Sequence, residues 1–550
     1  MGFEMFRKQT EAEAHDMPIL CQERQKNGGQ RGVFGVDTGR VIGRDAVFLT
    51  LISAVSQLLG FGYRVALSRL VGAQVMGLYQ LIMPAYSVLM SLTAIGLTAA
   101  VSNLSARWLA QRNLRAARQT VGLSLRWFLL AAAVVGGVSI VLYDPISVYL
   151  LGDARTQLGL VLLVPCVMLT GVENVHKYFF YGSGKVRPPA LVELTEQFVR
   201  AGAVLGLLVL LAPRDPEQSV GVIVTGMILC EVVSAATLVV LYRRWCRRVG
   251  NGGRGERAAQ LYRRIWAIAA PVGLTALLGN GMNAANAALI PQRLAAFGMS
   301  REQAMSAFGV VCGMTMPMLA LPTVFLSPLN LVVMPRVARA AVLGQKETVR
   351  WGIGRSVEVV SLVILPCMAL LMVLGGDVGL LLFGQSRAGE HIVPLAVAMA
   401  MGCYQSVLTG GLNATDHSAG AAAAALIGDV VQLAVTVYAV KEYGLEGYAA
   451  GVLISSAVGL LLCAGAVRKH TGMKVFTWRQ VGMPGLAALL CWQTSRLLYT
   501  QLLAMGAEPA LRVGVVLLFG GLVFVCAACA MGLNLGVRGR VFPHRRENLR

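Results

Sequence analysis

Long apolar runs recur along almost the whole chain, separated by short polar segments. Each run has about 20 residues, enough for an α-helix to cross a hydrocarbon core of roughly 30 Å. A transmembrane β-barrel would show strands of about ten residues with alternating polarity, and this alternation is absent. The pattern therefore predicts an all-α polytopic membrane protein with about 14 transmembrane helices. We expect these at residues 45–66, 78–102, 120–143, 157–176, 190–212, 219–242, 265–290, 305–334, 356–374, 392–411, 419–440, 447–467, 480–495 and 513–533.

The first twelve predicted helices form two halves of six. The segment LLGFG at 58–62 is echoed by LLGNG at 277–281, and a Pro-containing helix follows each of them. Transporters use two such pseudo-symmetric halves to build a midplane cavity and alternate its access. The expected domains are a disordered cytoplasmic extension at 1–44, the N-terminal half at 45–242, a basic cytoplasmic linker at 243–264, the C-terminal half at 265–467, helices 13 and 14 at 468–533, and a basic cytoplasmic tail at 534–550.

Composition excludes a soluble globular protein. Of the 550 residues 56% are hydrophobic and only 14% are charged, and the mean hydropathy is +0.65. The net charge of +21 does not indicate a nucleic-acid partner, because the basic residues favour every second loop. The termini and even-numbered loops contain 36 of the 48 Lys and Arg residues, whereas the odd-numbered loops contain 9. The positive-inside rule then predicts a multi-pass cell-membrane protein with both termini in the cytoplasm, in contact with anionic lipid.

Two arginines, Arg64 and Arg69, close the first apolar run. A charge in or beside a spanning helix is costly unless it reaches the interface or faces a polar cavity. Both side chains are within reach of the helix end, so the sequence leaves two readings open. They either extend to the membrane surface or contribute to a substrate site.

Further polar groups fall within predicted helices. Glu196 and Arg200 are four residues apart on helix 5, so they share a helix face and can pair. Together with Glu231 on helix 6 they form either an ion-coupling site or a neutralised structural pair. Asn280 and Asn283, with Asn286 one step further, lie along one face of helix 7, where they either bond to neighbouring helices or line a sugar-binding cavity.

Three segments carry a family resemblance. The first contains Gly60, Phe61, Tyr63, Arg64, Arg69, Gly72, Gly77, Tyr79, Gln80 and Pro84; the second keeps Tyr178, Phe179, Gly182, Glu196, Gln197 and Arg200; the third begins IPQRL at 290–294. In this combination the chain resembles the stage V sporulation protein B and polysaccharide biosynthesis group. That group belongs to the multidrug/oligosaccharidyl-lipid/polysaccharide (MOP) exporter superfamily, together with the lipid II flippases. The chain departs from the group at His176 and Lys177, where relatives have an arginine-containing segment.

The resemblance implies a MATE/MOP-like fold and a flippase that translocates an undecaprenyl-pyrophosphate-linked saccharide, a precursor of peptidoglycan or another envelope polysaccharide, by alternating access. The alternative is a cation-coupled multidrug antiporter of the same superfamily, which needs an acid-lined cavity. A lipid II polymerase-type enzyme needs an outward catalytic acid in a substantial loop, and the outer loops are too short for one. We therefore expect a transporter and not an enzyme.

Guanidinium groups match phosphate oxygens, so Arg64, Arg69 and Arg293 are the candidates to bind pyrophosphate. Gln80, Gln197, Asn280 and Asn283 are the candidates for hydroxyls or amides. Na⁺ and H⁺ remain open as coupling ions, and a monomer is expected. No Walker A sequence or metal-ligand cluster is present, and the CxxC at 526–529 lies inside an apolar run without further ligands, so no cofactor or metal is expected.

Overall fold

The computed structural model describes residues 38–250 and 252–533, and this part of the chain is helical, without strands. The chain divides into two compact units, residues 1–48 and residues 49–550. The predicted tail at 534–550 lies outside the described residues. So does the predicted N-terminal extension, except for residues 38–44, which begin the first described helix, α3 (Thr38–Met90).

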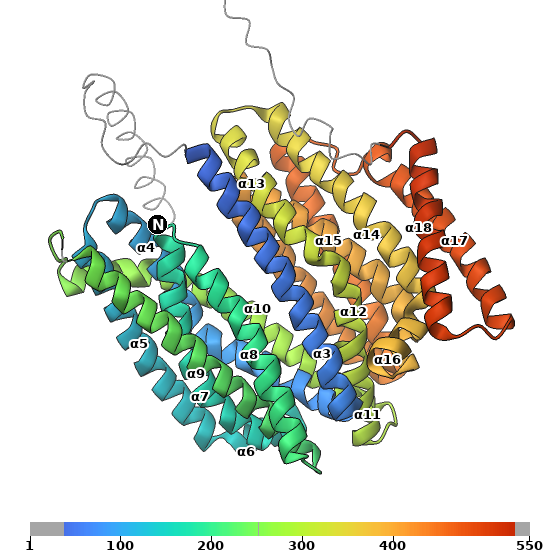
Figure 1. The fold of residues 1–550 in the computed structure, drawn as a ribbon, viewed down its shortest axis with the longest axis horizontal. Helices are drawn as coiled ribbons and strands as arrows, with labels where there is room; N and C mark the ends of the chain where they lie inside the picture. The colour runs from blue at the N-terminus through green and yellow to red at the C-terminus, as the bar shows by residue number, and fades with distance from the viewer. Residues whose placement is uncertain (1–37, 251, 534–550) are drawn as a thin grey trace, which may run out of the picture. The chain divides into compact units, whose positions relative to one another are not determined.

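The helices of the N-terminal half follow α3 in order along the chain. They are η2 (Ser91–Ile95), α4 (Gly96–Ala110), α5 (Leu114–Val141), α6 (Tyr143–Pro145), η3 (Ile146–Leu151), η4 (Ala154–Thr156), α7 (Gln157–Gly182), α8 (Arg187–Leu211) and α9 (Pro216–Val249). Helix α9 packs against α7 and α8, and α4 packs against α7. Figure 1 shows these helices in blue to green.

The helices of the C-terminal half begin after the linker. They are α10 (Ala258–Ala296), α11 (Arg301–Val310), η5 (Val311–Thr315), α12 (Met316–Ala320), η6 (Leu321–Phe325), α13 (Leu326–Val342), α14 (Lys346–Phe383), η7 (Ser386–Gly389), α15 (Ile392–Ala414) and α16 (Ser418–Thr471). A final hairpin follows, made of η8 (Trp478–Gly482), α17 (Met483–Ala504) and α18 (Pro509–Ala530). It packs against α14, where the Arg512 guanidinium donates to both carboxylate oxygens of Asp377 at 2.7 Å.

The expected number of crossings is confirmed. The described residues contain 11 helices or helical runs long and apolar enough to span a membrane. Two of them, Phe48–Ala110 and Ser418–Thr471, each contain a kink and cross twice, and α17 supplies one further crossing. The kinks occur at Gly72 (φ 75°) and Gly444 (φ 57°), where the backbone is in a region that side chains other than glycine rarely adopt.

Some predicted helix boundaries were wrong. The loop expected between helices 1 and 2 is only the kink at Gly72, so the second crossing begins five residues before the predicted Leu78. The eighth crossing, expected as one helix, is instead divided among α11, η5, α12, η6 and α13. Pro317 and Pro322, which lack a backbone N–H, lie in the first turns of α12 and η6.

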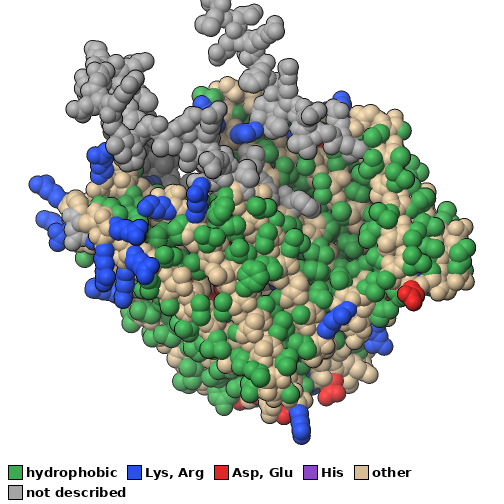
Figure 2. Space-filling view, viewed as in Figure 1, with side chains coloured by type: hydrophobic (Ala, Val, Ile, Leu, Met, Phe, Trp, Pro, Cys, Tyr) green, Lys and Arg blue, Asp and Glu red, His purple; other side chains and the backbone are tan. Residues whose placement is uncertain are grey.

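Because the connections alternate between two ends, the crossings define a basic end, near residues 110, 249, 342 and 471, and an opposite end, near residues 72, 145, 213, 298, 386 and 444. The basic end carries Arg107, Arg247, Arg248 and Arg468 in the last turns of its helices. On the face drawn in Figure 2, most of the Lys and Arg side chains gather around the ends of the N-terminal-half helices.

Candidate functional site

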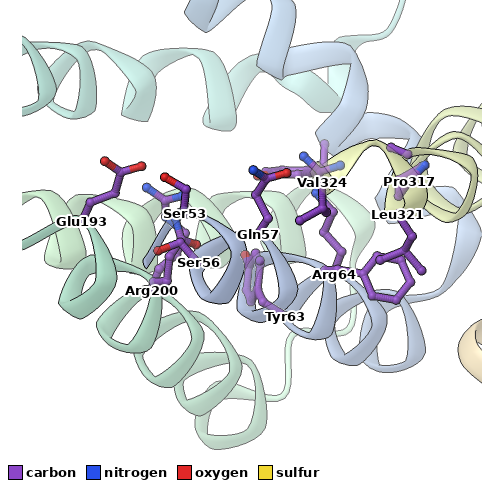
Figure 3. A pocket seen from close by; sticks show the side chains of 15 residues that line it. Ser53, Ser56, Gln57, Tyr63, Arg64, Glu193, Arg200, Pro317, Leu321 and Val324 are labelled. Carbon is purple, nitrogen blue, oxygen red and sulfur yellow. The ribbon is translucent and has the colours of Figure 1, made fainter. Parts of the chain in front are cut away.

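A polar stripe runs along the first crossing. Ser56 and Gln57 each lie three or four residues from both Ser53 and Gly60, and Arg64 lies four residues after Gly60, so α3 presents all five on one face. This face borders a cavity of about 440 Å³ (Figure 3). On the first crossing, the residues that line the cavity run from Ser53 to Arg64, before the kink at Gly72.

The other walls of the cavity come from both halves of the protein. Glu193, Gln197 and Arg200 contribute from α8, and Tyr79 contributes from the second crossing. The C-terminal half supplies an apolar wall from α12 and η6, which consists of Pro317, Ala320, Leu321 and Val324. Of the residues predicted to bind substrate, the structure brings Arg64 and Gln197 together here, and Arg200 joins them.

Several polar atoms at the cavity have no protein partner. Ser56 Oγ, Tyr63 OH and Arg200 Nε are buried and without a hydrogen bond in the described structure. Arg64 is exposed, and no carboxylate of the described residues forms an ion pair with it. Buried polar groups are usually hydrogen-bonded, so these atoms are available to water or to a polar ligand.

Behind the cavity lies a network of charges on α7, α8 and α9. The Arg200 guanidinium donates to the Glu196 carboxylate, and its distance to Glu231 Oε1 is 3.5 Å. Lys177 Nζ lies 3.2 Å from Glu193 and 3.9 Å from Glu173. The predicted pairing of Glu196 with Arg200 is therefore present, and Glu231 belongs to the same cluster.

Past Arg64, toward the opposite end, the two halves of the protein are in direct contact. Arg69 donates to the carbonyl oxygens of Leu381 and Leu382, at 2.7 Å from the latter, where α14 ends. Gln80 donates to the Cys312 carbonyl at 2.9 Å. These two predicted substrate ligands thus join the halves and do not line the cavity.

Two glycines allow the main chains to approach closely at the same place. A Cβ atom on Gly77 would overlap the carbonyl oxygen of Met305, and one on Gly309 would overlap that of Ala73. The crossing of α3 and α11 therefore leaves no room for a side chain. We define the contacts of Arg69, Gln80, Gly77 and Gly309 as the interlobe closure.

The asparagines of α10 serve mainly as contacts between helices. Asn280 donates to Ser91 Oγ at 2.7 Å, and Asn286 accepts from the Thr436 hydroxyl at 2.7 Å. Asn283 is exposed, and Arg293 is half-buried near the opposite end of α10. Asn280, Asn283 and Arg293 are not among the residues that line the cavity.

Sequence reasoning missed several cavity residues. Ser53 and Gln57 were treated as part of an apolar run, although their spacing with Gly60 and Arg64 was a visible signal of a polar face. The bridge made by Lys177 was missed as well. Its four-residue spacing from Glu173 indicated a pair, but its contact with Glu193 depends on how α7 packs beside α8.

A model of the family described as polysaccharide biosynthesis protein matches residues 42–341, more than half of the chain. The chain belongs to this family. The matched segment includes the cavity-lining parts of α3, α8, α12 and η6, together with the charge network. The predicted polysaccharide biosynthesis family is thereby confirmed.

Two curated relatives of this chain come from Bacillus subtilis (strain 168). Stage V sporulation protein B is 23% identical over 442 residues, covering 76% of this chain and 83% of the relative. Lipid II flippase MurJ is 21% identical over 484 residues, covering 81% of this chain and 86% of the relative.

Solved structures show the same fold. Lipid II flippase MurJ in an inward closed conformation aligns with a TM-score of 0.66 at 10% identity, covering 88% of this chain and 98% of that structure. An inward-facing multidrug resistance MATE family transporter of the MOP superfamily aligns with a TM-score of 0.63 at 14% identity, covering 77% and 99%. The predicted architecture of two six-helix halves followed by two helices is confirmed.

Proposed function

We propose that this protein is a flippase that moves an undecaprenyl-pyrophosphate-linked saccharide, a precursor of peptidoglycan or another envelope polysaccharide, across the cell membrane by alternating access. Family membership and the relatives named as a sporulation protein and a lipid II flippase support a lipid-linked substrate. The protein acts as a transporter and not as an enzyme. A monomer is sufficient, because one chain supplies both halves of the cavity.

The observation that carries the proposal is the cavity between the halves. A sugar-pyrophosphate headgroup cannot cross hydrocarbon alone, because its polar groups would lose their hydrogen bonds. Arg64 and Arg200 supply positive charge for the phosphates. Ser53, Gln57 and Gln197 supply donors and acceptors for hydroxyls and amides.

The direction of transport follows from the basic end, which we assign to the cytoplasm by the positive-inside rule. Both termini and the linker at 243–264 then face the cytoplasm, and the interlobe closure seals the cavity from the outside. A headgroup enters from the cytoplasmic leaflet and binds between the halves. Breaking the interlobe closure and forming new contacts at the basic end would expose the headgroup to the other side.

The cation-coupled antiporter fits the cavity less well. A site for cationic drugs requires unpaired acids, whereas the cavity contains two arginines and one acid, Glu193, which pairs with Lys177. Three buried acids, Glu173, Glu196 and Glu231, lie behind the cavity and form ion pairs with Arg200 or Lys177.

The test is transport in liposomes containing a fluorescent lipid-linked disaccharide-pentapeptide, followed as protection from an external quencher with and without an imposed membrane potential. We expect protein-dependent flipping, with the Arg64→Ala variant slower by at least about tenfold, since hydrogen bonds to charged groups contribute roughly 1.5–3 kcal/mol. Arg126→Ala is the matched control, because Arg126 is exposed on α5 and does not line the cavity.

Both variants are first compared with the wild type for insertion and melting temperature. Normal flipping by Arg64→Ala would remove Arg64 from the site. Absence of flipping by the wild type, with ethidium efflux in the same vesicles, would replace the proposal with the antiporter.

A further inference from the structure

An apolar groove of about 550 Å³ lies between α5 and α10, away from the residues that line the cavity. Helix α5 contributes Trp127 and Val134 to one wall, and α10 contributes Trp266 and Leu274 to the other. The floor is formed by η2 and the first turn of α4. Val134 and Leu274 are each 59% exposed on spanning helices, so the groove opens toward the hydrocarbon of the bilayer.

Beyond its two tryptophans, the groove offers no free hydrogen-bonding side chain to a ligand. The hydroxyls of Ser91 and Thr93 in the floor donate to carbonyl oxygens of their own helix, each at 2.8 Å. The other lining residues are glycine, alanine, valine and leucine. A polar ligand would lose its hydrogen bonds to water here, whereas a hydrocarbon chain would lose none.

The walls of the groove belong to different halves of the protein. Helices α4 and α5 are in the N-terminal half, and α10 begins the C-terminal half. Helix α4 touches α10 at the floor, where a Cβ atom on Gly96 would overlap the carbonyl oxygen of Ala269. The Arg264 guanidinium of α10 lies 5.1 Å from the ring centre of Trp108 on α4. The groove therefore depends on α10 lying against α4.

Three aromatic rings mark the end of the groove nearer the basic end. Trp127 lies 5.1 Å from Tyr262 and 6.2 Å from Trp266, measured between ring centres. Tyr262 and Trp266 are in the first three turns of α10, and such residues favour the level of the lipid headgroups. From Trp266 to Leu277 the groove follows α10 for about 16 Å. This is the depth of one leaflet, half of a hydrocarbon core of roughly 30 Å.

Positive charge lies beside the same end of the groove. Arg263 is exposed, and it precedes Trp266 by three residues and Ala270 by seven, so α10 presents it on the face that lines the groove. No carboxylate of the described residues forms an ion pair with Arg263. A negatively charged headgroup complements this arginine, whereas a zwitterionic headgroup brings no net charge.

The size of the groove favours a lipid chain over a helix of another protein. A helix of about 10 Å diameter that followed the groove for 16 Å would occupy roughly 1,300 Å³. This is more than twice the volume of the groove. A single acyl chain is narrower and can follow the floor between the two walls.

We propose that the groove binds one acyl chain of an anionic phospholipid from the leaflet at the basic end, with the headgroup at Arg263, and that this lipid stabilises the arrangement in which α10 lies against α4. The lipid contacts both halves, so it binds this arrangement better than one in which the walls separate, and it increases the population of this arrangement accordingly. The inference goes beyond the proposed function, because it does not depend on the headgroup that the cavity carries.

Two substitutions test the two parts of the site. Arg263→Gln removes the charge, and Val134→Trp fills the groove with a larger apolar side chain. The matched controls are Arg468→Gln, at an exposed arginine in the last turn of α16, and Leu518→Trp, at a residue of α18 that is 79% exposed. All four variants are first compared with the wild type for insertion and melting temperature.

Native mass spectrometry of the full-length protein in detergent counts the lipids that it retains when phosphatidylglycerol or phosphatidylcholine is added. We expect the wild type to retain one phosphatidylglycerol molecule at concentrations at which it retains no phosphatidylcholine. Arg263→Gln should weaken this binding about fivefold, the contribution of one basic residue near an anionic lipid surface. Val134→Trp should abolish it, and both controls should match the wild type.

Two results of this measurement would overturn the site. One is equal retention of the two lipids by the wild type, and the other is equal retention of phosphatidylglycerol by the wild type and Val134→Trp. A dimer that retains no lipid would assign the groove to a second copy of the chain and would also overturn the proposal.

The effect on conformation is measured as the distance between spin labels at Arg214 and Glu442, which are exposed near the opposite end, one in each half. The Arg69→Ala background is used, because it lacks part of the interlobe closure. We expect vesicles containing phosphatidylglycerol to reduce the population of long distances relative to vesicles of phosphatidylcholine alone, and Val134→Trp to remove this difference. Binding of phosphatidylglycerol without any change in the distances would overturn the stabilising effect of the lipid.

Discussion

Arg69 offers a direct way to perturb the interlobe closure. Its guanidinium donates to the carbonyl oxygens of Leu381 and Leu382, in the last turn of α14. The last carbonyls of a helix have no partner within the helix, and a cation there also interacts favourably with the helix dipole. Replacing Arg69 by alanine removes both interactions and leaves the helices themselves unchanged.

The magnitude follows from the two hydrogen bonds. Arg69 is exposed, so we assign each bond about 1 kcal/mol, the usual net contribution of a hydrogen bond in water. The Arg69→Ala change then destabilises the closed arrangement by about 2 kcal/mol, which lowers its population relative to the open one roughly thirtyfold. Arg69→Lys keeps the charge but not the fork of donors, so its effect should be intermediate.

The assay is the distance between spin labels at Arg214 and Glu442, measured by pulsed electron resonance. Both positions are exposed near the opposite end, one in each half. The exposed Cys526 and Cys529 are first replaced by serine. We expect a longer distance population in Arg69→Ala that is absent in Arg126→Ala. Identical distance distributions in all variants would refute the assignment of Arg69 to the closure.

Two further predictions concern packing. Gly77→Ala would force a methyl group against the Met305 carbonyl and should broaden the same distance distribution, whereas Gly62→Ala, which meets open space, should leave it unchanged. Asp377→Asn breaks the ion pair with Arg512 and should lower the melting temperature, because it leaves a half-buried cation without its partner; an Asp377→Leu, Arg512→Met double variant should recover much of the loss. A melting temperature equal to that of the wild type in Asp377→Asn would show that α18 is attached to α14 by other contacts.

The number of crossings was predictable because the membrane thickness sets the length of each span. Each apolar run of that length in the sequence therefore indicates one crossing. The turns between crossings and the breaks within them were less predictable. At Gly72 and Gly444 the chain reverses its course with a single residue of positive φ, so polar residues nearby gave the appearance of loops. The breaks in the eighth crossing arise from Pro317 and Pro322, which the sequence shows but whose effect depends on neighbouring helices.

The candidate site was predictable only where local spacing defines it. Glu196 and Arg200 pair within one helix, so their four-residue spacing in the sequence is enough to predict the contact. The separation of Arg64 from Arg69 depends instead on which part of α3 faces α14 and which faces the cavity, and this is a property of tertiary packing. Five residues on one helix place the two side chains at different levels of the membrane, about 7.5 Å apart along the axis.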